Sequence, residues 1–79
     1  MLDELKTGKK TVGVKETQKA VRDGRVRRLF IADDADERIV GPLVALCEQT
    51  DVPVERVATM RELGALCGID VGAAAAGLL

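Results

Sequence analysis

Apolar and polar residues follow two different periods along the first third of the chain. Residues Lys10–Val14 alternate at every second position, which predicts a short strand with Val12 and Val14 on one side. From residue 15 the apolar spacing becomes helical, and the pattern predicts a helix over Lys15–Asp23 that ends at Gly24. We therefore expect a strand that leads directly into a helix.

The middle of the chain predicts a second unit of the same kind. The apolar run Arg28–Ala32 is typical of a central strand, and we expect its Phe30, the only aromatic residue, to pack in the core. Residues 41–50 predict a helix with Pro42 at its first position, where a missing N–H costs nothing. Residues Val54–Val57 predict a third strand.

The last third of the chain opens with a helix start signal. Residues Thr59–Glu62 fit a capping box, so we expect a helix that runs to about Leu66 and stops at Gly68. Residues 72–79 allow two interpretations. Their alanines favour a helix by propensity, whereas the flanking glycines and short length suit a buried strand. At the other end of the chain, residues 2–6 predict a helical turn.

This alternation of strands and helices predicts a layered α/β fold. With 79 residues, 47% of them hydrophobic, and a net charge of −1, we expect one soluble domain, residues 1–79. The longest apolar run, residues 71–79, is nine residues long, whereas a membrane span needs about 20. The chain also begins without a secretory signal, so we expect it to be cytoplasmic and without a membrane partner.

Residue types that serve catalysis and metal binding are scarce. The chain has no His, the commonest general base near neutral pH, and two Cys without His do not complete a usual zinc site. We therefore expect no catalytic residue, no metal and no cofactor, with Cys47 and Cys67 as reduced, buried fillers. The acidic run Asp33–Glu37 suggests magnesium, although a solvated loop or helix start is the commoner structure.

Charge is divided unevenly along the chain. Residues 1–28 hold nine cations and four acids, a net charge of +5, whereas residues 29–79 hold three cations and nine acids, a net charge of −6. A polyanion responds to the local field, which extends about 8 Å at physiological salt. The first third therefore suits contact with RNA or DNA, unless its lysines simply form a solvated helix face.

Residues Gly13–Lys19 carry the most chemical information. They place a strand end, a glycine and a helix start in succession, where backbone N–H groups and the helix dipole attract phosphate. The segment matches neither a P-loop nor a G-x-G-x-x-G motif. Glu16 and Lys19 are three residues apart and share a helix face. They can form a simple exposed pair. Alternatively, the carboxylate accepts from a base N–H while the cations hold the nucleic-acid backbone.

Three segments together carry a resemblance to a known family. Residues Gly13–Lys19, Ile31–Asp36 and Leu63–Ala74 resemble, in this order, the large-subunit ribosomal protein seven-Ae family, whose superfamily includes the thirty-e ribosomal protein and small bacterial paralogues. The resemblance covers Thr11 to Leu79. It implies a three-layer α/β/α sandwich around a four-stranded mixed sheet. It also implies binding to kink-turn RNA, a bent internal loop with tandem sheared G·A pairs.

The family motif G-x-N-E-x-x-K connects particular residues with this RNA. Gly13, Glu16 and Lys19 match its glycine, glutamate and lysine, while Lys15 stands in place of the asparagine. The resemblance implies that this motif meets guanine edges in the major groove, with Arg22 among the cations that add salt-dependent affinity. Lysine donates to guanine or phosphate but cannot accept as an amide does, so we expect altered discrimination between RNA variants.

The loop after the last predicted helix is implied as a second RNA contact. In the family, apolar residues of this loop cover a base flipped out of the RNA, and Ile69 and Val71 beside Gly68 suit that role. The alternative is that both aliphatic side chains fill the core. Asp70 is expected to face solvent, because a carboxylate that faces phosphates is unfavourable.

The resemblance thus implies a monomer without enzymatic activity whose partner is a structured RNA, with the ribosome as one candidate assembly. Such a protein selects a bent RNA by contacting groups that only the bend brings together. The rival interpretation is a protein-interaction module of the same fold that does not bind RNA. That module would use the acidic half, from Asp33 to Glu62, as its working surface.

Overall fold

The computed structural model describes residue 5 and residues 8–79. The helical turn predicted for residues 2–6 lies outside this range except for Leu5, which is buried. The elements, in chain order, are β1 (Lys10–Val12), α2 (Val14–Arg22), β2 (Arg28–Ala32), α3 (Glu37–Gln49), β3 (Val54–Val57), α4 (Met60–Leu66) and β4 (Ala75–Leu78). The second and third predicted strands are confirmed with their predicted bounds.

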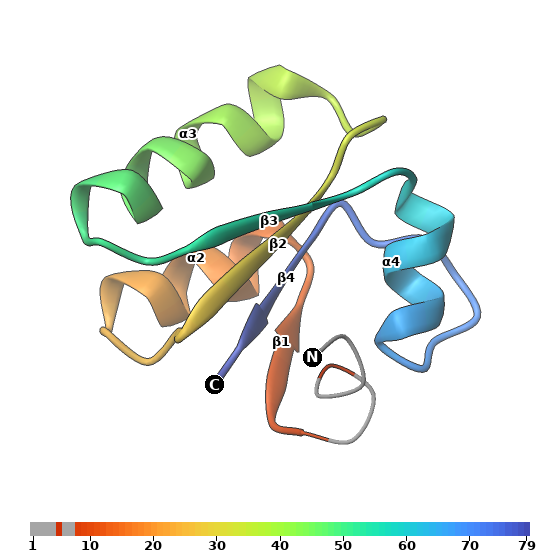
Figure 1. Ribbon diagram of the computed structural model, residues 1–79, viewed down its shortest axis with the longest axis horizontal. Helices are drawn as coiled ribbons and strands as arrows, with labels where there is room; N and C mark the ends of the chain where they lie inside the picture. Colours follow the sequence, from red (N-terminus) through yellow and green to blue (C-terminus); the bar gives the residue numbers. More distant parts are fainter. Residues whose placement is uncertain (1–4, 6–7) are drawn as a thin grey trace.

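The four strands form one mixed sheet in the order β1-β4-β2-β3 (Figure 1). β4 lies antiparallel to both of its neighbours, and β2 pairs with β3 in parallel. The register places Leu78 of β4 between Lys10 of β1 and Arg28 of β2. Residues 75–78 are therefore a buried strand, the second of the two interpretations of the last segment.

The helices cover both faces of the sheet. α2 and α3 pack against each other on one face, and α4 packs on the other face against β2, β3 and β4 (Figure 1). This is the expected three-layer sandwich. Leu29, Phe30 and Ile31 of β2 are each at most 1% exposed, so Phe30 lies in the core as predicted. None of the helices in the described part of the chain has the length and apolar character of a membrane crossing.

α3 begins earlier than the sequence pattern predicts. Asp36 is its N-cap, with a carboxylate that accepts from the Arg38 N–H at 2.9 Å and from the Arg38 guanidinium at 3.0 Å. The Arg38 side chain, and then its N–H, hold the pKa of the Asp36 carboxyl below its usual value. An aspartate side chain can accept from the free N–H groups at the start of a helix. Gly41, at the predicted start, has no side chain that could do so. Pro42 thus lies inside the helix, and its prediction as the first helical residue is wrong.

β1 is shorter than predicted. It ends at Val12, and Val14 is already the first residue of α2, so these two valines do not share a strand face. The buried residue of β1 is Thr11. Gly13 lies between strand and helix with φ 99°, a conformation that glycine adopts without the penalty of a Cβ. Because the chain turns at Gly13, Val14 continues the alternating pattern of residues 10–14 and yet lies in the first turn of α2.

The start of α4 is capped twice, and one cap is directly testable. The Thr59 hydroxyl oxygen accepts from the Glu62 N–H at 3.0 Å, and an Asp34 carboxylate oxygen accepts from the Met60 N–H at 2.7 Å. We expect Thr59→Ala to lower the free energy of unfolding by about 1 kcal/mol, because one N–H loses its partner. Urea denaturation measures this change. Thr59→Ser keeps the hydroxyl, and equal stability of the two variants would contradict the role of the cap.

Candidate nucleic-acid interface

The first turn of α2 lies against the beginning of β4. The Gly13 N–H donates to the Ala75 carbonyl oxygen at 2.8 Å, and the Gly13 carbonyl oxygen accepts from the Thr17 N–H at 3.1 Å. Gly13 is the N-cap residue and has no side chain with which to cap the helix. The two bonds therefore place the positive end of the α2 dipole beside the start of β4.

A buried pair of hydroxyls fixes α2 on the sheet. Thr11 Oγ1 of β1 and Thr17 Oγ1 of α2 are 2.8 Å apart, and both residues are buried. Gly77 of β4 lies next to this pair, because a Cβ there would be 2.8 Å from Thr11 Oγ1 and 3.2 Å from Thr17 Cγ2. β4 thus needs glycine at this position for α2 to approach so closely.

Charged residues occupy the solvent side of α2. The opposite side is buried and consists of Thr17, Ala20 and Val21. Lys15, Lys19 and Arg22 are exposed and follow each other at helical spacing, which aligns them along one face. Glu16 is exposed in the first turn. Within the described residues none of these four side chains forms an ion pair, so their charges face solvent.

The loop of residues 68–74 folds back onto α4. The Ile69 N–H donates to the Gly64 carbonyl oxygen, and the Ala73 N–H donates to the Met60 carbonyl oxygen, both at 3.0 Å. The loop is thus tied to the beginning and to the middle of α4. Its conformation is set by backbone bonds and not by side-chain contacts alone.

Two glycines let this loop lie so close to α4. A Cβ at Gly64 would overlap the carbonyl oxygen of Val71, and a Cβ at Gly72 would lie 3.1 Å from Cβ of Met60. From the sequence, Gly72 is expected only to flank the last segment, and the close approach is predicted at neither glycine. A glycine in the interior of the predicted helix 59–66 is the signal that could have indicated the close approach.

The structure gives the two aliphatic residues of the loop different environments. Val71 is 69% exposed, whereas Ile69 is partly buried and packs against the core. Ile69 is therefore neither a fully exposed loop residue nor a fully buried core residue. Asp70 is exposed, and Gly68, with φ 80°, turns the chain out of α4. The apolar surface that this loop offers to solvent is therefore mainly that of Val71.

The loop after α4 and the start of α2 are both joined to the start of β4. The loop leads through Ala73 and Ala74 into Ala75, the first residue of β4, which accepts the bond from Gly13. The start of α2 and the end of the loop therefore lie at the same end of the sheet (Figure 1).

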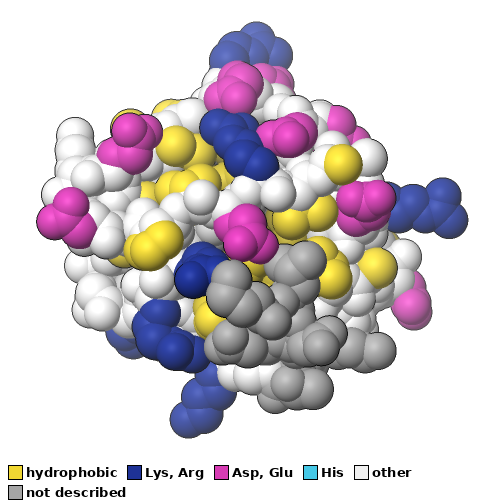
Figure 2. Space-filling model, viewed as in Figure 1, with side chains coloured by type: hydrophobic (Ala, Val, Ile, Leu, Met, Phe, Trp, Pro, Cys, Tyr) yellow, Lys and Arg dark blue, Asp and Glu magenta, His cyan; other side chains and the backbone are white. Residues whose placement is uncertain are grey.

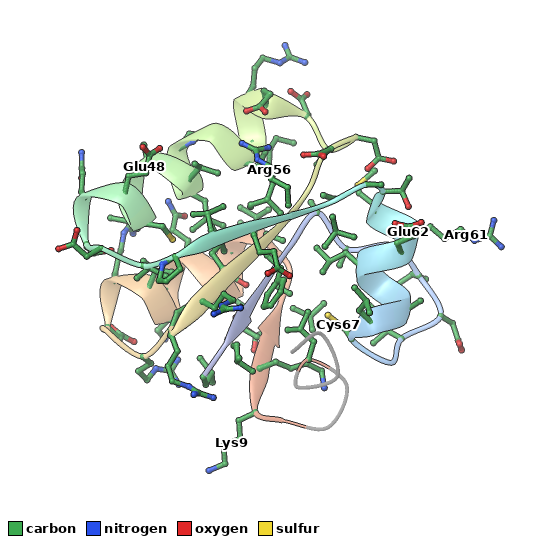
Figure 3. All side chains as sticks on the ribbon, in the orientation of Figure 1. Lys9, Glu48, Arg56, Arg61, Glu62 and Cys67 are labelled. Atoms are coloured by element: carbon green, nitrogen blue, oxygen red, sulfur yellow. The ribbon has the colours of Figure 1, made fainter. Side chains whose placement is uncertain are left out.

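The exposed carboxylates of the acidic run contact other residues of the same chain. Asp34 caps α4 and Asp36 caps α3. Asp33 and Glu37 lie 3.4 and 3.6 Å from the guanidinium of Arg56, which is labelled in Figure 3. In the part of the chain that the structure describes, no three His, Cys, Asp or Glu side chains are grouped as metal ligands. These carboxylates thus serve helix ends and ion pairs.

Both cysteines are buried free thiols. Cys47 lies in α3. Cys67, which is labelled in Figure 3, is the C-cap residue that follows α4. Burial raises the pKa of both thiols, while the charge of Lys10 acts in the opposite direction at Cys67. A thiol with a raised pKa stays protonated at neutral pH and is a poor nucleophile. This agrees with the expectation of buried fillers.

The comparison with protein families identifies the family of this chain. Residues 2–78 match the Ribosomal protein L7Ae/L30e/S12e/Gadd45 family. The chain is a member of this family. The resemblance drawn from the three motifs is thereby confirmed, and the L7Ae-type sandwich is the fold that the strands and helices form.

Similar proteins within the L7Ae family include several bacterial ones. A protein of Caldanaerobacter subterraneus subsp. tengcongensis, named RNA-binding protein, is 46% identical over 68 residues, which are 86% of this chain and 83% of that protein. RNA-binding protein YbxF of Geobacillus stearothermophilus is 39% identical over 75 residues, 95% of this chain and 92% of that protein.

A solved structure shares the fold closely. The Giardia lamblia 15.5kD RNA binding protein superposes with a TM-score of 0.90 at 30% sequence identity. The match covers 98% of this chain and 68% of that chain. The whole described sandwich, including the α2 face and the loop after α4, therefore has its counterpart in that structure.

Proposed function

We propose that this chain binds RNA at a kink turn and stabilises the bent form. The observation that carries the proposal is the bond between Gly13 and Ala75, which places the start of α2 beside the start of β4, the strand into which the loop that exposes Val71 leads. Membership of the L7Ae family and similarity to proteins named RNA-binding support it. No covalent bond is made or broken, so the proposed activity is binding and not catalysis.

Glu16 is proposed to read the bases. Its carboxylate accepts only, and it is exposed at the helix start, so it suits the N–H donors on the edge of a guanine. Hydrogen bonds to a charged group are shorter and stronger than neutral ones. Lys15 next to it donates to guanine O6 or N7, or to phosphate. Because lysine replaces an amide of the family motif, the site has one acceptor fewer and should tolerate more RNA variants.

The loop after α4 is proposed to cover an unstacked base. Val71 offers an exposed apolar side chain, and the partly buried Ile69 connects it with the core. A base that leaves the stack exposes apolar surface, which contact with Val71 removes from water. Gly68 provides the turn that brings the loop back along α4.

The bent conformation is selected because both contacts need it. Glu16 at the start of α2 and Val71 in the loop belong to one rigid end of the sandwich, so only a bent RNA presents the guanine edges and the flipped base together. All these residues come from one chain, and the proposed binding unit is therefore a monomer. The RNA is proposed to be cytoplasmic, in the ribosome or elsewhere.

Binding to a kink-turn duplex tests the proposal. We expect tighter binding to a duplex with tandem sheared G·A pairs than to a fully paired duplex of equal length. We also expect the RNA ends to approach each other when protein is added, as measured by energy transfer between dyes. Equal affinity for the two duplexes would refute the proposal.

The cations of α2 predict a salt dependence. If Lys15, Lys19 and Arg22 each neutralise one phosphate of a short-stem RNA, log K should fall against log salt with a slope of about −3. Lys19→Gln should weaken binding and make this slope smaller by about 1. Arg38→Gln removes the same charge from α3, where Arg38 bonds Asp36, and should leave the slope unchanged. Equal slopes for Lys19→Gln and the wild type would contradict a phosphate contact.

The alternative, a protein-interaction module that works through the acidic half, has less support. Asp34 and Asp36 are engaged at helix ends, and Asp33 and Glu37 pair with Arg56. Within the described residues the acidic side chains are thus partly neutralised, whereas the α2 face is not.

A further inference from the structure

A second cationic surface lies at the other end of β4. Lys9, Arg25 and Arg27 are exposed there. The Lys9 carbonyl oxygen accepts from the Leu79 N–H at 2.9 Å, and the Arg27 N–H donates to the Leu78 carbonyl oxygen at 2.7 Å. Arg27 Nε donates to the Leu79 carbonyl oxygen at 2.9 Å, which holds this guanidinium at the end of the strand. Lys9 and Arg27, the residues directly before β1 and β2, thus flank the end of β4.

α2 connects this surface with the proposed RNA site. The helix begins at the start of β4 and has nine residues, a length of about 13 Å. Just beyond its end, the Arg25 N–H donates to the Ala20 carbonyl oxygen at 3.0 Å. The cations of α2 are therefore followed directly by Arg25 and Arg27.

The space-filling view shows how charge is distributed on one face. Lys and Arg side chains gather at the lower left, toward the end of the sheet where Figure 1 places the C-terminus (Figure 2). Asp and Glu side chains lie mostly over α3, β3 and α4 (Figure 2). Lys9 points away from the sheet at the lower end (Figure 3).

Among the described side chains, the carboxylates of Asp23 and Glu55 lie near this surface, and each pairs with a neighbouring arginine. Asp23 is 3.9 Å from Arg25, with both side chains about half exposed, a geometry in which an ion pair contributes little. Glu55 lies 3.6 Å from Arg28, which is only partly exposed. A phosphate can therefore replace Asp23 as the partner of Arg25 at small cost, since the guanidinium fork binds phosphate in a bidentate manner.

We propose that Lys9, Arg25 and Arg27 hold the phosphate backbone of an RNA stem that leaves the kink-turn site along α2. This inference rests on the proposed function and adds a second contact to it. The side chains of Lys9, Arg25 and Arg27 only donate, so they should attract the RNA backbone without reading its sequence. It would fix the direction of the stem relative to the sandwich.

Stem length is the variable that tests this surface. We compare kink-turn RNAs with short stems to RNAs in which either stem is extended by about one helical turn. The wild-type protein should bind one of the extended RNAs more tightly and with a steeper salt slope. The double variant Arg25→Gln/Arg27→Gln should bind the short-stem RNA within about twofold of the wild type. On the extended RNA it should bind about tenfold more weakly, with a slope smaller by about 2.

The double variant Arg38→Gln/Arg61→Gln is the matched control. It removes two exposed arginines from α3 and α4, and it should change the affinity equally for short and extended stems. If stem extension brings the wild-type protein no gain, or if Arg25→Gln/Arg27→Gln keeps the full gain, the second surface is refuted while the kink-turn site stands. If the wild-type protein does not bind even the short-stem RNA, the proposed function and this inference fail together.

Discussion

Gly64→Ala is expected to destabilise the protein although it improves helix propensity. Alanine in a helix interior is more favourable than glycine by about 1 kcal/mol, so propensity alone predicts a gain. The added Cβ, however, would overlap the carbonyl oxygen of Val71, which is backbone and cannot rotate away. Overpacking of this kind costs about 1–3 kcal/mol, which outweighs the gain in propensity. We therefore expect a lower free energy of unfolding in urea.

Gly41→Ala in α3 provides the matched control for this prediction. The nearest atom to a Cβ at Gly41 is a Glu37 carboxylate oxygen at 3.7 Å, an ordinary contact with a flexible side chain. Because Pro42 restricts a Cβ on the preceding residue, this variant should gain less than the full propensity difference of about 1 kcal/mol, but it should not be destabilised. If the Gly64→Ala variant still folds, displacement of the loop after α4 should also weaken its binding to kink-turn RNA. Equal stabilisation by the two alanines would show that the loop does not press on α4.

Glu16→Ala is expected to separate specific from non-specific RNA binding. The variant removes a negative charge from the proposed interface, so simple electrostatics predicts tighter binding to any RNA. If Glu16 accepts from guanine, its loss leaves those donors unpaired and costs about 1.5–3 kcal/mol. This corresponds to a loss of kink-turn affinity of about 10- to 100-fold. Affinity for a fully paired duplex should stay unchanged or rise.

The control for this experiment is Glu48→Ala. Glu48 is exposed in α3 and labelled in Figure 3, and its removal changes the net charge by the same amount. We expect Glu48→Ala to leave the preference for the kink-turn RNA intact. A Glu16→Ala variant that binds the kink turn as well as the wild type would end the proposal that this carboxylate reads bases.

The sequence predicted the elements whose signals are local. β2 is an apolar run from Leu29 to Ala32, β3 is a short segment that begins and ends with valine, and the Thr59 cap lies within four residues of its partner. The start of α3 was missed because Pro42 is a strong N-terminal signal, and the weaker-looking Asp36 turned out to provide the cap. Local patterns thus fail where two start signals compete within one helix.

Other features depend on residues that lie far apart in the sequence. Whether residues 75–78 form a helix or a strand is decided by pairing with β1 and β2, which no local propensity contains. The need for Gly77 comes from Thr11 and Thr17. The family motif located the candidate residues of α2 from the sequence. Their proximity to the loop, through the Gly13–Ala75 bond, became visible only in the folded chain.

The position of β4 has a consequence for synthesis. Of the four described strands it leaves the ribosome last, yet it lies between β1 and β2 and supplies the carbonyl that receives the Gly13 N–H. Until residues 75–78 have been translated, the earlier strands lack their common neighbour, and the N-terminus of α2 lacks its anchor. A nascent chain interrupted before this point should therefore neither fold nor capture a ligand, because the sheet lacks one of its two central strands.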